Sequence, residues 1–538
     1  MHDYVIVGAG SAGCVLAARL SENADNRVLL LEAGPRDTDP RIRMPAAFPK
    51  LFKSELDWDI ETEPQRGANG RRMYWPRGKV VGGCSSTNAM VYMRGNRRDF
   101  DDWAAQGCTG WSFEECLPYF KKSERNLRFK GEYHGDSGGL CVSDGVYTNP
   151  LSPVFLEACR QAGIVITDDF NGREQDGAAL VQVTQENGQR CSAARAFLKP
   201  ALGRANLKVE TGAHATQILF DGSRAVGIAY VQNGQTKTVR AEREVILCLG
   251  AVHSPQLLML SGVGPSAHLA EIGIECRHDL PGVGENLHDH LIMGSITECK
   301  QKVTLDTAES VWNLAQYLLL NRGPLTSNVA EACAFVKSDP SLDRPDLQFH
   351  FAPAFFYRHG LTGEKRIAYS FGPCLVQPES RGTLRLRSKD PMAKPLVDPN
   401  YLTAERDMRA LLAGVKLTRA IAVQPAFTPY RGTEFLPGKA VQDDEQLKNF
   451  IRDYCETLYH PVGSCKMGVG PMAVVDPELR VHGLDGLRVA DASIIPKIVG
   501  GNTNAAAILI GERAADFIRD DTRALRAADT QALRAAAG

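Results

Sequence analysis

The sequence predicts an α/β protein of two domains: a Rossmann-like domain with a parallel sheet, and an α+β domain built on an antiparallel sheet. The chain has 538 residues, too many for one ordinary core of about 100 to 200 residues. Its first 31 residues have the pattern strand, glycine-rich turn, helix, strand. With 43% apolar and 23% charged residues, the composition is that of a folded globular protein.

The Rossmann-like domain begins at the N-terminus. Residues 4–7 and 28–31 are short, continuous apolar runs, and a helical pattern of apolar residues at 15–20 lies between them. Strands that are apolar on both faces are typical of a parallel sheet covered by helices on both sides. A strand at 245–249 followed by a helix through 256–260, and then a strand at 487–491 followed by a helix at 504–518, return the chain to this unit.

The second domain is predicted from the middle of the chain. Strand-like segments at 346–351 and 383–386, together with a helical stretch at 405–422, favour an antiparallel sheet with helices. We therefore assign residues 1–100, 201–295 and 456–538 to the first domain. Residues 101–200 and 296–455 form the second.

Charge and cysteine content exclude several classes of protein. Lys plus Arg is 62 against 63 for Asp plus Glu, so no net field favours nucleic acid or anionic lipid. The 14 cysteines are scattered without a C-x-x-C pair, which indicates reduced thiols. The apolar strand starts at Tyr4, so we expect no secretory signal and a cytoplasmic protein. No window approaches 18 consecutive apolar residues, which excludes a membrane span but leaves room for peripheral contact with the inner membrane.

The turn after the first strand has the spacing of a dinucleotide-binding loop. Glycines at positions 8, 10 and 13 match G-x-G-x-x-G, and Glu32 ends the second strand 19 residues after Gly13. Gly8 permits the tight turn, Gly10 lets a pyrophosphate approach the backbone, and Gly13 lets the helix approach the strand. Glu32 can accept hydrogen bonds from ribose hydroxyls. The loop includes Ser11 and Ala12. It does not by itself distinguish FAD from NAD.

A second glycine loop, at 78–90, narrows the choice. Its run of small residues, Gly82-Gly83-Cys84-Ser85-Ser86, indicates that the backbone passes close to something flat. Here the chain resembles the glucose-methanol-choline (GMC) family of FAD-dependent oxidoreductases. The resemblance continues through five further segments and so spans nearly the whole chain: 250–264, 281–290, 459–464, 489–493 and 501–504.

The resemblance implies noncovalent FAD and a set of site residues. The residues along the flavin are Gly82, Gly83, Asn88, Ala89, Met90 and Val91; further FAD contacts are Asp491, Asn502 and Thr503. His460 is the catalytic histidine, and Asn504 fills the second catalytic position. Some members attach FAD covalently through a histidine in the second loop, but this chain has Thr87 at that position, which excludes that linkage.

The chemistry of alcohol oxidation suits these residue types. The hydroxyl proton must be removed while hydride leaves the carbon, and imidazole has an unperturbed pKa near working pH. An asparagine amide can donate to the developing alkoxide without titrating. We therefore expect His460 to act as the base and Asn504 as the donor.

Two patterns outside these segments favour structural roles. Gly135-Asp136-Ser137-Gly138-Gly139 satisfies G-x-S-x-G, but it follows no buried strand and opens no helix, so we interpret it as a surface turn. His288-Asp289-His290 has no third group of metal ligands beside it. We expect no metal and interpret these three as structural hydrogen-bonding residues.

Substrate and acceptor are predicted from segments 325–331 and 343–351, which resemble the branch of the family that oxidises choline, aliphatic alcohols and polyethylene glycols. We expect a primary aliphatic or polyether alcohol as substrate, an aldehyde as product, and a quinone or similar compound as electron acceptor. Choline remains a second hypothesis, because Glu331 with Phe355, Phe356 and Tyr357 can in principle form a cage for a quaternary ammonium. Two further hypotheses are an oxidase that reduces oxygen to peroxide and a non-enzymatic nucleotide-binding scaffold.

The segment 311–320 is the candidate for membrane contact. Six of its apolar residues recur at helical spacing and give an apolar face: Val311, Trp312, Leu314, Ala315, Leu318 and Leu319. A lid helix over the substrate channel is the competing interpretation.

Overall fold

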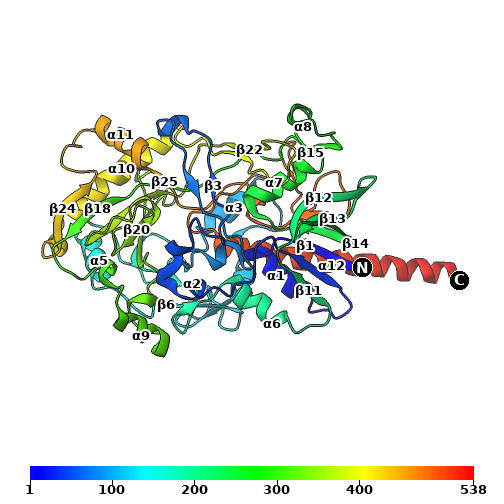
Figure 1. Ribbon diagram of the computed structural model, residues 1–538, viewed down its shortest axis with the longest axis horizontal. Helices are drawn as coiled ribbons and strands as arrows, with labels where there is room; N and C mark the ends of the chain where they lie inside the picture. The colour runs from blue at the N-terminus through cyan, green and yellow to red at the C-terminus, as the bar shows by residue number, and fades with distance from the viewer. Residues whose placement is uncertain (538) are drawn as a thin grey trace.

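Two large sheets organise the chain in the computed structural model, which describes residues 1–537. The seven-stranded sheet lies on the right in Figure 1 and the eight-stranded sheet on the left. One continuous cluster of buried apolar side chains extends through both. The two halves of the molecule are therefore joined by a shared core.

The seven-stranded sheet is the predicted Rossmann-like unit. Its order is β11-β2-β1-β14-β13-β12, with β26 paired to β14. Strand β1 lies between β2 and β14, parallel to both, and β11 and β26 are also parallel to their neighbours. Strands β12 and β13 extend the sheet from β14 with antiparallel pairing, so the sheet is mixed and not parallel throughout. These strands are β1 (His2–Val7), β2 (Val28–Leu31), β11 (Leu207–Glu210), β12 (His214–Asp221), β13 (Arg224–Gln232), β14 (Gln235–Leu247) and β26 (Leu487–Val489). The helices of this unit are α1 (Ser11–Leu20), α7 (Gly250–Leu260) and α12 (Asn504–Ala537). The predicted order of strand, turn, helix and strand at the N-terminus is confirmed.

The eight-stranded sheet is antiparallel, as predicted. Its order is β24-β18-β21-β20-β19-β7, and β17 and β25 pair with each other at one end, next to β21. The strands are β7 (Gly177–Leu180), β17 (Leu291–Ile292), β18 (Ser295–Cys299), β19 (Ala332–Val336), β20 (Leu347–Ala352), β21 (Ala368–Leu375), β24 (Arg431–Leu436) and β25 (Glu456–Thr457). Helices α5 (Leu151–Gln161) and α10 (Glu405–Ala422) pack against it. The helix predicted at 405–422 is confirmed.

One strand assigned to this sheet lies elsewhere. The strand predicted at 383–386 forms as β22 (Thr383–Arg385), but it pairs with β23 (Leu396–Asp398) in a separate two-stranded sheet that contacts α7. The reason lies just before it, where the backbone of Gly382 exchanges two hydrogen bonds with Leu287. This pairing holds the chain beside the first domain instead of the antiparallel sheet.

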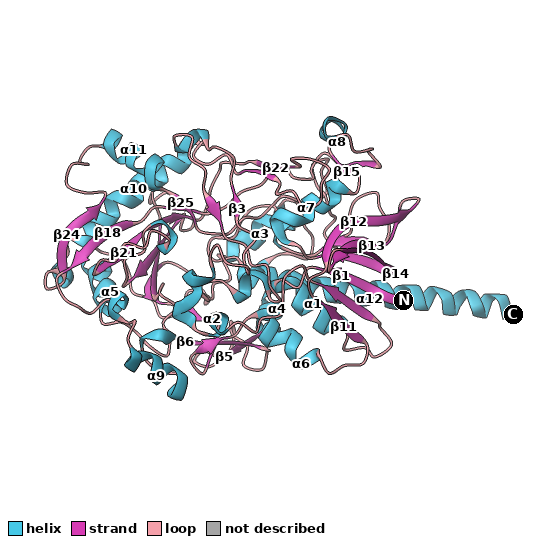
Figure 2. Cartoon of the chain, viewed as in Figure 1, coloured by secondary structure: helices cyan, strands magenta, loops and turns pink. Residues whose placement is uncertain are grey.

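Shorter elements complete the fold (Figure 2). The remaining helices are α2 (Pro40–Arg43), α3 (Arg97–Ala105), α4 (Phe113–Ser123), α6 (Lys199–Ala201), α8 (Ser266–Ile272), α9 (Val311–Leu320) and α11 (Asp444–Tyr454). The remaining strands are β3 (Ile60–Glu61), β4 (Tyr74–Trp75), β5 (Glu124–Asn126), β6 (Leu140–Asp144), β8 (Gln182–Val183), β9 (Gln185–Glu186), β10 (Gln189–Arg190), β15 (Val263–Gly264) and β16 (His278–Asp279). Within residues 1–537, no helix is both long and apolar enough to cross a bilayer. The assignment of residue ranges to two domains stays a prediction.

Candidate active site

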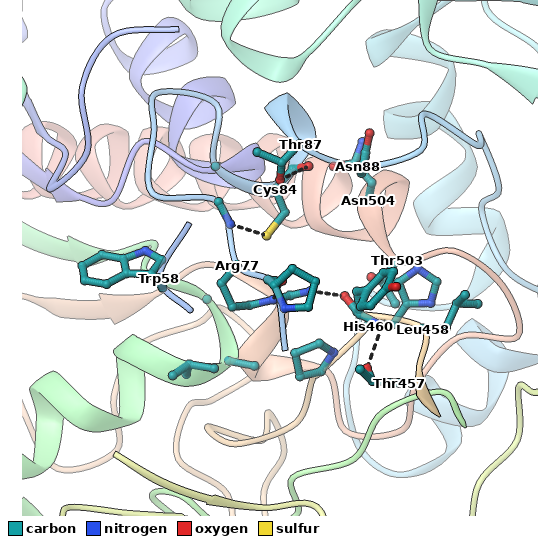
Figure 3. Close-up of a pocket in the computed structure, with 18 of the residues that line it drawn as sticks. Trp58, Arg77, Cys84, Thr87, Asn88, Thr457, Leu458, His460, Thr503 and Asn504 are labelled. Carbon is teal, nitrogen blue, oxygen red and sulfur yellow. Dashed lines mark hydrogen bonds between the residues drawn. The ribbon is translucent and has the colours of Figure 1, made fainter. Parts of the chain in front are cut away.

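A cavity of about 390 Å³ is lined by the predicted site residues, except Gly13 and Gly82. One part of its wall comes from the turn after β1 and the loop before residue 91, and another from residues 457–461 and 502–504. Figure 3 shows Cys84, Thr87 and Asn88 on one side of this space and His460 on another. Segments far apart in the sequence therefore line one cavity.

The turn after β1 is shaped by glycines that have no room for a side chain. Gly8 has φ +101°, and a Cβ there would lie 2.5 Å from the Cys248 carbonyl oxygen. A Cβ on Gly13 would lie 2.0 Å from the carbonyl oxygen of Gly8. At Gly10 the nearest atom would be 3.8 Å away, because this residue faces the cavity. Ser11 and Ala12, at the start of α1, also line the cavity, so the amides of a helix N-terminus are available to an anion.

Glu32 holds the turn from the end of β2. Its carboxylate accepts hydrogen bonds from the backbone N–H groups of Ala9, at 2.9 Å, and Gly34, at 2.7 Å. Burial raises the pKa of Glu32 to about 7. The side chain also lines the cavity, where a ribose hydroxyl can reach it.

The second glycine loop lies directly on the first. Gly82 donates its N–H to the carbonyl oxygen of Ala9 at 2.7 Å, and a Cβ on Gly83 would lie 2.8 Å from the Cα of Gly10. Gly83 lines the cavity, whereas Gly82 does not. The Asn88 side chain bends the next turn, because its Oδ1 accepts from the N–H of Met90 at 2.9 Å. Asn88, Ala89, Met90 and Val91 all line the cavity.

These features fit FAD. An open helix N-terminus suits a pyrophosphate, a buried carboxylate suits a ribose, and a side-chain-free loop suits an isoalloxazine ring. At the same end of the cavity, Trp58 packs on His253 with ring centroids 4.2 Å apart. The sequence analysis assigned no role to Trp58 or His253: Trp58 belongs to no motif, and His253 lies in the segment 250–264 without being singled out as a site residue.

Asp491 and Asn504 fix the start of two helices beside this site. Asp491 accepts from the N–H of Gly250 at 2.9 Å and from the hydroxyl of Ser254 at 2.5 Å, which holds the first turn of α7. Asn504 begins α12, and its Oδ1 accepts from the Ser11 hydroxyl at 2.7 Å. Both residues line the cavity, together with Thr503.

His460 lies at the other end and is held on three sides. Its backbone N–H donates to Asp289 Oδ1 at 2.7 Å. Its Nδ1 lies 3.0 Å from Nδ1 of His290, and its Nε2 lies 3.3 Å from Nδ2 of Asn502. Burial, followed by the influence of His290, holds the pKa of His460 well below the usual histidine range. The imidazole is therefore neutral, with a lone pair on Nε2 if the Asn502 amide donates to it.

Of the two asparagines, Asn502 and not Asn504 has its side-chain amide beside the His460 ring. Asn502 Oδ1 accepts from Gln348 Nε2 at 3.2 Å, which directs the Asn502 amide nitrogen toward His460. Asn504 is instead turned toward Ser11 in the glycine turn. The two asparagines are two residues apart and serve opposite ends of the site.

Asp289 and His290 hold His460 in place, although the sequence analysis gave them only structural roles. Asp289 accepts from Thr457 and Tyr401 hydroxyls as well as from the His460 backbone. Burial lowers the pKa of His290 to about 3, so this ring is neutral beside His460. His288 has the expected structural role, because its Nε2 accepts from the Ile498 N–H at 2.9 Å. Only the fold reveals this difference between adjacent residues.

Ser137 and Glu331, which the sequence analysis also considered, do not line the cavity. Ser137 is exposed in a turn before β6, as predicted. The Glu331 carboxylate is buried and accepts from the hydroxyls of Ser327, at 2.5 Å, and Ser152, at 2.7 Å. Neither Ser137 nor Glu331 lines the cavity, whereas Thr87 does.

The fold and the site together define a FAD-dependent oxidoreductase. The chain belongs to the GMC oxidoreductase family, whose two family models match residues 2–292 and 378–511. The predicted family, fold and cofactor are confirmed.

Individual relatives cover almost the whole chain. An alcohol dehydrogenase [acceptor] of Pseudomonas putida is 48% identical over 96% of both chains. The human mitochondrial choline dehydrogenase is 45% identical, over 96% of this chain and 90% of its own length. Among solved structures, pyridoxine 4-oxidase from Mesorbium loti has a TM-score of 0.88 at 34% identity, covering 96% of this chain and 99% of its own.

Proposed function

We propose that the protein is an alcohol dehydrogenase that oxidises primary alcohols with an uncharged aliphatic or polyether tail to aldehydes. The observation that carries the proposal is the neutral His460 ring, with its Nε2 beside the Asn502 amide in the cavity. A lone pair and an N–H donor that meet at one point suit a single hydroxyl oxygen.

In the proposed reaction, His460 Nε2 accepts the hydroxyl proton while Asn502 donates a hydrogen bond to the same oxygen. Bound FAD supplies the acceptor for the hydride that leaves the carbinol carbon. Protonation at Nε2 places a positive charge on His460, and its Nδ1–H then donates to the lone pair on His290 Nδ1. Asp289 keeps the ring in position through the His460 backbone.

The second catalytic position has two candidates. Asn502 is supported by its contact with His460 Nε2, and Asn504 by the family resemblance. We favour Asn502 as the hydroxyl donor. Asn504 then joins the start of α12 to the start of α1, where FAD is bound.

An uncharged substrate is supported by the apolar part of the cavity lining. This part includes Phe48, Phe52, Ile292, Val329 and Phe356. Choline oxidation remains the second candidate because the human choline dehydrogenase is a relative. The cage proposed for choline lacks support, because Glu331 is engaged with Ser327 and Ser152 outside the cavity.

The proposal includes a quinone or similar compound as electron acceptor and a cytoplasmic enzyme that works at the inner face of the membrane. The alcohol dehydrogenase [acceptor] of Pseudomonas putida supports this choice over an oxidase. FAD is proposed to be noncovalent, because Thr87 has no imidazole for attachment. Acid precipitation should leave the yellow colour in solution, and a coloured pellet would refute this part.

Anaerobic flavin bleaching with a panel of alcohols tests the reaction. Primary alcohols of increasing length, polyethylene glycols and choline are compared at equal concentration. We expect faster bleaching with uncharged alcohols than with choline, and slower reoxidation by air than by a quinone. Faster bleaching with choline would favour the second candidate. Peroxide formation as fast as quinone reduction would identify an oxidase.

A further inference from the structure

Helix α9 exposes an apolar face to solvent. Six of its ten side chains are large, apolar and 42–86% exposed: Val311, Trp312, Leu314, Leu318, Leu319 and Leu320. Tyr317, on the opposite side, is the helix's only buried residue. A surface helix of a soluble protein normally has the reverse arrangement, with its apolar stripe toward the core. Exposed patches of this kind mark interaction sites.

Local hydrogen bonds of polar side chains hold the N-terminal end of the helix. The Asn313 amide donates to the carbonyl oxygen of Ala308 at 2.9 Å, and the Ser310 hydroxyl caps the N-terminus by accepting from the Asn313 N–H. None of residues 311–320 lines the substrate cavity. This placement favours a docking surface over the lid considered from the sequence. In Figure 1, α9 lies at the lower edge of the molecule, away from the two sheets.

The charges around α9 favour an anionic partner. The helix contains no acidic residue, and Glu309, just before it, is paired with Lys50 at 2.9 Å and Lys365 at 3.4 Å. Arg322 follows the helix, and Arg43 lies close enough to Tyr317 to influence its pKa. Both arginines are exposed and form no ion pair with the described part of the chain. An apolar face with tryptophan, flanked by unpaired cations, is typical of an element that lies in the surface of an anionic bilayer.

We propose that α9 docks the protein on the surface of a membrane that contains anionic lipid, without crossing it. The inference extends the proposed function by naming the contact surface. Helix α9 contacts the turn Pro324–Thr326, which in turn contacts Pro45–Leu51. Phe48 of that segment lines the cavity. Docking through α9 thus brings a wall of the substrate site near the bilayer, where long-tailed alcohols and quinones are dissolved.

Vesicle sedimentation of the holoenzyme tests the proposal. Phosphatidylcholine vesicles are used with and without phosphatidylglycerol. The variant Leu318→Ser/Leu319→Ser removes two exposed apolar side chains, and Val165→Ser/Val423→Ser is the matched control, with similarly exposed residues elsewhere. We expect the wild type and the control to bind anionic vesicles, and the α9 variant to partition at least about tenfold less. Arg322→Gln should weaken binding to anionic vesicles and leave the weak binding to neutral ones unchanged.

Turnover with a soluble dye is measured in parallel and should be the same in all these variants, because none of the changed residues lines the cavity. If the α9 variant loses vesicle binding but keeps normal turnover, the result bears on docking through α9 alone. If turnover is poor in every sample, the result contradicts the proposed reaction and not the docking. Two results would overturn the proposal. One is equal vesicle binding by the wild type and the α9 variant, or none by either. The other is a wild-type dimer in solution that the α9 variant abolishes, which would make a second copy the partner of this face.

Discussion

The two ends of the cavity are built in different ways. The end around Gly8, Gly13 and Gly83 consists of backbone segments so close that added Cβ atoms would lie 2.0–2.8 Å from main-chain atoms. The end around His460 is held by side chains from separate segments, among them His290 and Asn502. The first end depends on the absence of side chains. The second end depends on hydrogen bonds between side chains. Substitutions at the first should disturb the fold or the cofactor, and substitutions at the second should disturb the reaction.

The largest effect is expected from Gly13→Ala. Its methyl group would overlap the Gly8 carbonyl oxygen at 2.0 Å, which is backbone and cannot move aside. The cost should exceed the roughly 1 to 3 kcal/mol of ordinary overpacking, so we expect loss of folded, FAD-containing protein. Gly10→Ala is the matched change, since its methyl group meets no atom within 3.8 Å and points into the cavity. That variant should fold but retain less FAD. Circular dichroism and FAD content separate the two outcomes, and equal behaviour would contradict the distinction.

His460→Ala should retain FAD and slow anaerobic flavin reduction by about two to four orders of magnitude, the range for a positioned base. Stopped-flow absorbance measures the rate. Ser137→Ala is the control, because Ser137 is exposed and lies outside the cavity. A near-normal rate for His460→Ala would remove this residue as the base. A marked loss of flavin reduction in Ser137→Ala would indicate a functional role for the turn at Ser137.

Substitutions of the two asparagines test which of them acts in the reaction and which acts in FAD binding. Asn502→Ala removes a donor next to His460 Nε2 and should slow flavin reduction by about 10²- to 10³-fold, with FAD content unchanged. Asn504→Ala removes the acceptor for the Ser11 hydroxyl and should mainly weaken FAD retention. Rate and FAD content are measured for both variants. If Asn504→Ala slows reduction more than Asn502→Ala at full FAD content, the assignment from the family resemblance is the better one.

The smallest effect concerns pH. His460 acts as a base in its neutral form, and burial holds its pKa well below the usual value near 6.5. Lowering the pKa of a base moves the acid limb of kcat/KM to lower pH, so activity should be retained as pH falls through 6.5. His290→Gln keeps an acceptor for His460 Nδ1–H and leaves His460 buried, so the limb should stay below pH 6.5. We expect less than about a tenfold change at neutral pH. A limb at 6.5 in the wild type would contradict the effect of burial.

The cofactor end could be predicted because its determinants are local. The spacing of Gly8, Gly10 and Gly13 and the position of Glu32 follow from one strand, one turn and one helix. Gly8, Gly10 and Glu32 line the cavity, and Gly13 packs against the backbone of Gly8. The residues around the proposed catalytic base, His460, were only partly predictable. His460 came from a family motif, whereas the contact of Asn502 depends on Gln348, which lies more than a hundred residues away in the sequence.

The sequence by itself determined the parallel-sheet unit, the antiparallel second sheet, the FAD loop and the apolar helix at 311–320. Each of these is encoded by hydrophobic periodicity or glycine spacing within a few tens of residues. Only the tertiary structure decided that Asp289 and His290 hold His460 while His288 does not, that Glu331 is buried outside the cavity, and that α9 faces solvent. These outcomes depend on which distant segments meet, and contacts between distant segments leave no period or spacing in the sequence of either one.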